Sequence, residues 1–185
     1  MHSLVLSFDL AFMIFLAVFA VLLIASIVFH LKCRVPFVPT PRRVIDMMID
    51  QAKLRDGQLV YDLGAGDGRV LSLAKRRCPG IRAIGYEGAI GVWMFGKLRT
   101  WLFGGGVEMR RKNFLTVDLS GADVIFLYLC IDALKLLVPK LQRELKPGTR
   151  VISHAFRLPG LQPDFTREVP MLLNGRTKVH VYEWK

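Results

Sequence analysis

Residues 60–69 read V-Y-D-L-G-A-G-D-G-R, and this stretch decides the fold of the chain. The apolar run Leu59 to Leu63 predicts a buried strand that leads into a glycine-rich turn, and a helix is expected from about Asp67 to Arg77. Glycine has no Cβ, so the backbone of such a turn can bend tightly and approach a ligand closely. We therefore expect the backbone amides of the turn and of the helix N-terminus to bind a polar or negatively charged group.

The glycine spacing and the acidic residue before it narrow the kind of ligand. The dinucleotide fingerprint G-x-G-x-x-G would require a third glycine at position 69, where Arg69 stands. Asp62 comes just before the turn, at the tip of the expected strand. A carboxylate there suits a ligand with an ammonium or sulfonium group better than a ligand that presents a pyrophosphate.

A second acidic residue ends the next expected strand. Residues Ile81 to Tyr86 predict that strand, and Glu87 follows it. An acidic residue about 20 positions after the glycine turn can bind two ribose hydroxyl groups. A generic strand–helix–strand unit remains the alternative, but Asp62 and Glu87 at two strand ends favour a ligand site.

The pattern D-L-G-A-G-D-G-R, with Glu87 after the second strand, resembles motif I of the S-adenosylmethionine-dependent methyltransferases with the doubly wound fold. The resemblance implies that the cofactor is S-adenosyl-L-methionine. It also implies that the residues binding this cofactor at the first two strand ends are Asp62, Gly64, Ala65, Gly66, Asp67, Gly68 and Glu87.

The remaining pattern predicts an α/β protein with a doubly wound, mostly parallel, Rossmann-like sheet. The almost unbroken apolar run at 123–129 is typical of a strand that is covered on both faces. A proline-rich excursion precedes an antiparallel last strand. Further strands are expected at 107–112, 150–154 and 178–184, and helices at 41–54, 88–103 and 132–145.

Asn113 and Phe114, which follow the third expected strand, are further candidates for the ligand site. Strand ends line the ligand crevice in this fold, so Asn113 can hydrogen-bond the adenine edge while Phe114 packs on its face. Both can equally be ordinary loop residues.

The helix at 88–103 is rich in aromatic residues, and we expect it to cover the sheet, with contact to a membrane interface as the alternative.

An apolar run at 8–31 precedes this domain. At 1.5 Å per residue, about 24 helical residues span roughly 36 Å, more than a hydrocarbon core of about 30 Å. A cleaved signal peptide is the rival interpretation, but no Lys or Arg precedes the run. We therefore expect one N-terminal transmembrane anchor at 1–34 and a methyltransferase domain at 35–185. Because Lys32 and Arg34 follow the run, the positive-inside rule predicts a single-pass membrane protein with its catalytic domain on the cytoplasmic side.

Composition limits the other partners. The chain has 185 residues, a formal net charge of +11 and 52% hydrophobic residues. Its cysteines and histidines have no metal-ligand spacing, so we expect reduced thiols and no metal site. The positive charge permits a nucleic-acid partner, but topology and anionic lipid explain the basic cluster after the apolar run better. Nucleic acid is therefore the less favoured partner.

Further segments, in their order along the chain, resemble a narrower group. They are V-P-F-V-P-T-P at 35–41, A-D-V-I-F-L-Y-L at 122–129 and K-P-G-T-R-V-I-S-H at 146–154. This order resembles the small, often membrane-anchored protein-lysine methyltransferases, which include the enzymes acting on the adenine nucleotide translocase and the ATP synthase c-subunit. The resemblance implies a membrane-tethered enzyme that methylates lysine side chains of proteins, with membrane proteins among the candidate substrates.

Tyr128 is the candidate catalytic residue. Its hydroxyl and the nearby carbonyls can orient an amine, while apolar neighbours lower the pKa of the substrate lysine. Most of the acceleration is expected from alignment and exclusion of water. A packed core aromatic is the alternative role for Tyr128. Two functional alternatives also stay open, methylation of a lipid headgroup or other membrane-associated small molecule, and a non-catalytic cofactor-binding module.

Overall fold

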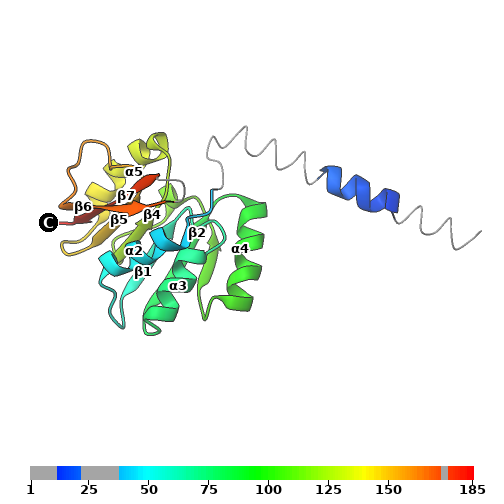
Figure 1. Ribbon diagram of the computed structural model, residues 1–185, viewed down its shortest axis with the longest axis horizontal. Helices are drawn as coiled ribbons and strands as arrows, with labels where there is room; N and C mark the ends of the chain where they lie inside the picture. The colour runs from blue at the N-terminus through cyan, green and yellow to red at the C-terminus, as the bar shows by residue number, and fades with distance from the viewer. Residues whose placement is uncertain (1–11, 22–37, 172–174) are drawn as a thin grey trace, which may run out of the picture. The chain divides into compact units, whose positions relative to one another are not determined.

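The protein is described from a computed structural model, which covers residues 12–21, 38–171 and 175–185. The chain divides into two compact units, Met1–Pro36 and Phe37–Lys185. In the first unit, residues 12–21 form a helix. In the second unit, helices and strands alternate along most of the chain (Figure 1).

The second unit contains a seven-stranded sheet with the strand order β3-β2-β1-β4-β5-β7-β6. Strands β1 to β5 run parallel, whereas β7 runs antiparallel to both β5 and β6. This arrangement confirms the expected doubly wound, Rossmann-like α/β sheet with an antiparallel last strand. The strands are β1 (Leu59–Leu63), β2 (Arg82–Glu87), β3 (Glu108–Arg111), β4 (Val124–Leu127), β5 (Arg150–His154), β6 (Phe165–Pro170) and β7 (Arg176–Glu183).

Strand β6 lies where the sequence predicts only a proline-rich excursion. It pairs with β7 in a register that runs from Phe165 opposite Val181 to Pro170 opposite Arg176. Proline cannot donate a hydrogen bond to a neighbouring strand, but an edge strand tolerates it because only one side is paired. The edge position therefore reconciles Pro170 with a strand.

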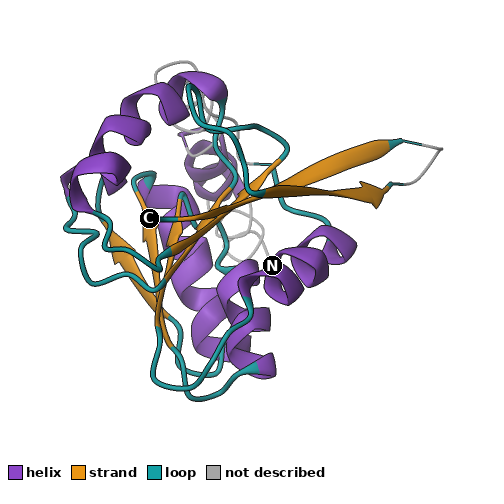
Figure 2. Ribbon diagram, turned by 90° about the vertical axis from the view of Figure 1, so that its left-hand side faces the viewer, coloured by secondary structure: helices purple, strands orange, loops and turns teal. Residues whose placement is uncertain are grey.

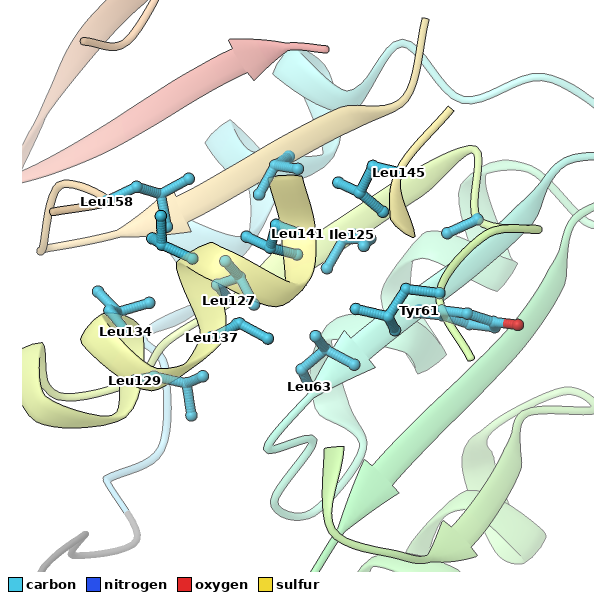
Figure 3. Close-up of a cluster of buried hydrophobic side chains, with 14 of the residues drawn as sticks. Tyr61, Leu63, Ile125, Leu127, Leu129, Leu134, Leu137, Leu141, Leu145 and Leu158 are labelled. Carbon is cyan, nitrogen blue, oxygen red and sulfur yellow. The ribbon is translucent and has the colours of Figure 1, made fainter. Parts of the chain in front are cut away.

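Helices cover both faces of the sheet (Figure 2). Because strand side chains alternate between faces, Val60, Phe126 and Ile152 pack with α2 and α3 on one face. Leu63 and Leu127 pack with α5 on the other face (Figure 3). The helices are α2 (Arg42–Ala52), α3 (Arg69–Arg77), α4 (Ile90–Phe103) and α5 (Ile131–Glu144), with a short 3-10 helix η1 (Phe114–Thr116).

Helix α4 covers the β2–β3 side of the sheet, as expected. Its inner side buries Gly96 and Thr100. Its outer side is unusually apolar, because seven large apolar side chains are more than half exposed there. They are Ile90, Met94, Phe95, Leu98, Trp101, Leu102 and Phe103.

The N-terminal prediction needs correction. Within residues 12–21, 38–171 and 175–185, no helix has both the length and the apolar character needed to cross a membrane. This finding contradicts the predicted localisation, a single-pass membrane protein with its catalytic domain on the cytoplasmic side. The rest of the predicted span, 8–11 and 22–31, lies outside the described residues.

Candidate active site

The glycine turn connects β1 to α3 and is hydrogen-bonded to the carboxyl end of β2. Gly64, Gly66 and Gly68 have φ angles of +83°, +57° and +71°, which glycine adopts without the strain that a Cβ would cause. The amides of Gly64 and Ala65 donate hydrogen bonds to the carbonyl oxygen of Tyr86, at 2.9 and 3.0 Å. The turn therefore follows β1, the strand beside which the strand order reverses toward β4, and open α/β sheets bind their ligands at this point.

Helix α4 fits closely against this turn. A Cβ added to Gly96 would lie 2.5 Å from the carbonyl oxygen of Gly66, and a Cβ on Gly68 would lie 2.4 Å from Cγ2 of Thr100. Both distances are shorter than a van der Waals contact, so a larger side chain would displace the backbone. The position of the turn therefore depends on α4.

Asp62 is a buried acidic residue that forms no ion pair with any of the described residues. It is 5% exposed, and none of the described residues donates a hydrogen bond to it. Burial, followed by the nearby carboxylates of Glu87 and Asp67, raises the pKa of Asp62 from 3.8 to about 8. A ligand ammonium beside Asp62 would supply the missing positive charge and lower this pKa.

Glu87 is held over the turn by two backbone amides. Its Oε2 accepts a hydrogen bond from Gly66 N at 3.1 Å, and its Oε1 accepts one from Ala89 N at 2.8 Å. The side chain is only half-buried, so its carboxylate remains accessible at the tip of β2. Glu87 thus links the glycine turn to the start of α4.

Asp67 has a different environment, because its carboxylate is bound by two arginines. It is 1% exposed and forms ion pairs with Arg69 at 2.8 Å and Arg99 at 3.4 Å. Arg99 also donates a hydrogen bond to the carbonyl oxygen of Asp67. These contacts tie α4 and the start of α3 to the turn, and they explain why an arginine stands in place of a third glycine.

Asn113 and Phe114 lie after β3, next to the same edge of the sheet. Asn113 Oδ1 accepts a hydrogen bond from Leu115 N at 3.0 Å and caps η1. Its side-chain NH₂ group is the part that remains for a ligand. Phe114 is half-buried against the hydrophobic cluster on the α5 face.

Comparison with known proteins identifies the family. A family profile described as the ANTKMT methyltransferase domain matches residues 62–165. A protein-lysine N-methyltransferase of Saccharolobus islandicus is 38% identical over 152 residues, which are 80% of this chain and 91% of that protein. The chain belongs to the ANTKMT methyltransferase family.

Two further relatives support this assignment. The adenine nucleotide translocase lysine N-methyltransferase of Mus musculus is 35% identical over 157 residues, 83% of this chain but only 65% of the mouse protein. The crystal structure of an RNA methyltransferase from Salinibacter ruber, in complex with S-adenosyl-L-homocysteine, superimposes with a TM-score of 0.70 at 33% identity. That comparison covers 79% of this chain and 93% of the other.

Family membership confirms the resemblance, the enzyme class and S-adenosyl-L-methionine as the cofactor. It favours an enzyme over the alternative of a non-catalytic cofactor-binding module. The residues present fit this cofactor, since no described residue donates a hydrogen bond to the buried Asp62 side chain and the half-buried Glu87 carboxylate lies at the tip of β2. The amides of Gly64, Ala65 and Gly66, which were expected to bind a ligand group, already donate to Tyr86 and Glu87.

Tyr128 of this methyltransferase directly follows β4 and is half-buried. Next to it along the chain, Leu129 approaches the glycine turn, because its Cδ2 would be 2.9 Å from a Cβ on Gly64. The ring of Tyr128 lies against the imidazole of His154, with 4.1 Å between ring centroids. His154 was absent from the sequence-based site, and its place at the end of a strand was the only available signal.

Proposed function

We propose that this methyltransferase transfers methyl groups to lysine side chains of proteins. The observation that carries the proposal is the 38% identity to a protein-lysine N-methyltransferase over 91% of that relative. The mouse relative, named for a translocase lysine, points to the same acceptor group. Because both of these relatives are named for protein lysines, methylation of a lipid headgroup or another small molecule is the less favoured alternative.

On the cofactor side, we assign Asp62 to the ammonium group and Glu87 to the ribose hydroxyls. Gly64, Ala65, Gly66 and Gly68 form the backbone cradle, with Asn113 and Phe114 at the adenine end. Asp67 has an indirect role in this assignment, because Arg69 and Arg99 already bind its carboxylate. It positions the turn rather than touching the cofactor.

S-adenosyl-L-methionine supplies a methyl group on a sulfonium sulfur, which an amine takes by in-line displacement. The lysine must first lose its proton, and the apolar end of β4 near Tyr128 and Leu129 lowers the pKa of an amine placed there. As the N–C bond forms, the C–S bond breaks and sulfur keeps the electron pair. The methylated ammonium then releases its proton to water.

RNA is the second candidate substrate. The Salinibacter ruber RNA methyltransferase is 33% identical, and the net charge of +11 suits a polyanion. Incubation of the purified protein with labelled S-adenosyl-L-methionine and separate protein, RNA and lipid fractions tests the choice. We expect label on lysines of the protein fraction, and label only on RNA or lipid would overturn the lysine assignment.

Glu87→Gln should weaken binding of S-adenosyl-L-methionine by about tenfold, because a neutral amide makes weaker hydrogen bonds than a carboxylate. Calorimetry measures this effect directly. Glu108→Gln is the matched control, since Glu108 is an exposed residue of β3 that pairs with Arg110. If the two variants bind S-adenosyl-L-methionine with equal affinity, Glu87 does not bind the cofactor.

A further inference from the structure

His154 is a buried histidine with an unused ring nitrogen. It ends β5 and is 3% exposed. Its Nε2 lies 3.1 Å from Oγ1 of Thr177 on β7. Its Nδ1 is buried and has no hydrogen-bond partner among the described residues. An unpaired buried polar atom is costly, so its retention calls for an explanation.

His154 lies near the place where the methyl-accepting lysine is expected to bind, at the carboxyl end of β4. Leu127 of β4 pairs with Ser153 of β5, so Tyr128 and His154 are neighbours at the carboxyl edge of the sheet. Asp62 pairs with Phe126, two residues before Tyr128. Because side chains alternate, Asp62, Tyr128 and His154 belong to the same face of the sheet.

The backbone after His154 is strained and firmly held. Ala155 has a φ of +67°, a left-handed conformation that is unfavourable for a residue with a Cβ. Three hydrogen bonds fix this bend: Ala155 N to the carbonyl oxygen of Lys178, Phe156 N to that of His154, and Ser153 Oγ to that of Phe156. Strain that the surroundings maintain is concentrated at functional sites. In this protein the strained bend at Ala155 ends strand β5 immediately after His154.

The imidazole is neutral at physiological pH, because burial lowers the pKa of His154 to about 4. We assign the ring proton to Nε2, where it is donated to Thr177 Oγ1, and this leaves a lone pair on Nδ1. A neutral acceptor of this kind can hold an N–H group without adding positive charge beside a sulfonium. Because its basicity is low, the imidazole can orient the amine but is a poor general base.

We propose that His154 orients the substrate amine, with Nδ1 accepting a hydrogen bond from an N–H of the acceptor lysine. This inference rests on the proposed lysine methylation. The ring of Tyr128 lies against the imidazole and is half-buried, and in this proposal it is displaced when the amine enters. One N–H on Nδ1 leaves the nitrogen lone pair free to point at the methyl group.

A spectroscopic measurement on the unaltered protein tests the hydrogen bond. In the complex with S-adenosyl-L-homocysteine, ¹⁵N NMR should show the Nε2–H tautomer of His154. Titration with n-butylamine should shift the Nδ1 resonance without protonating the ring. A resonance that n-butylamine leaves unchanged, or an Nδ1–H tautomer, would overturn the proposal. This readout needs no variant and no turnover.

Kinetics separates an orienting role from a structural one. His154→Gln can keep the contact with Thr177 but loses the Nδ1 acceptor, so kcat on a lysine peptide should fall by about tenfold to a hundredfold. Affinity for S-adenosyl-L-homocysteine should stay unchanged. Thr177→Val, which removes the Nε2 partner instead, should lower kcat less. If His154→Gln keeps the wild-type kcat, the inference fails, whereas a wild-type protein inactive on all lysine substrates refutes the proposed function itself.

Discussion

Affinity for S-adenosyl-L-methionine should rise by up to about a hundredfold between about pH 5.5 and about pH 7.5, a range in which most of the α-ammonium of the cofactor is still charged. The reason is Asp62, whose pKa of about 8 in the free protein keeps its carboxyl protonated through most of this range. The ammonium binds the ionised form, so binding expels a proton. Each pH unit below the pKa therefore costs up to about 1.4 kcal/mol of binding free energy.

Calorimetry in buffers of different ionisation enthalpy measures both the affinity and the released proton. At about pH 6.5, well below the pKa, close to one proton should leave for each cofactor bound. Asp62→Asn should bind weakly, release no such proton and lose the pH dependence. A wild-type affinity that is flat with pH would contradict this account of Asp62.

Without cofactor, the same group makes the fold less stable as the pH rises. The unfolded chain loses the Asp62 proton near pH 3.8, whereas the folded protein keeps it until about pH 8. Between these values the folded state binds more protons, so its contribution to stability falls with increasing pH. Cofactor-free Asp62→Asn should therefore melt at a higher temperature than the wild type at about pH 7.5, by several degrees.

Gly96→Ala should destabilise the protein by about 1–3 kcal/mol and weaken cofactor binding at least tenfold. The new Cβ would lie 2.5 Å from the carbonyl oxygen of Gly66, which is backbone and cannot rotate away. Either α4 or the glycine turn must move. Thermal unfolding and cofactor titration would report the two consequences.

Gly91→Ala provides a matched control on the same helix. A Cβ at Gly91 would meet nothing within 4 Å, so this variant should only gain the roughly 0.5–1 kcal/mol by which alanine is favoured over glycine in a helix. Opposite signs for the two variants are expected. Equal stability and affinity in both would show that α4 does not hold the turn in place.

The strand ends could be predicted because their signals are local. Asp62 and Glu87 each follow an apolar run, and parallel strands bring their carboxyl ends to one edge. Strands β1 and β5 were predicted with the bounds that the structure has, because short β-rich runs between turns leave few alternatives. The glycine turn and its place in the fold followed from the same pattern.

Other features depend on contacts that the sequence does not reveal. Arg99 reaches Asp67 across 32 positions, and no periodicity indicates such a pair. His154 meets Tyr128 only because β5 pairs with β4. The localisation was wrong for a different reason: hydropathy measured the whole apolar run at 8–31, but none of the helices among the described residues is long and apolar enough to cross a membrane.

The place of β7 has a consequence for biosynthesis. Although it is the last strand along the chain, β7 lies between β5 and β6 in the sheet. While the protein is being made, β5 therefore keeps an unpaired edge until residues 176–183 have left the ribosome, and such an edge is a template for pairing with other chains. A nascent chain that stalls before Arg176 should expose the backbone of β5, and it will depend on chaperones that bind unpaired strands.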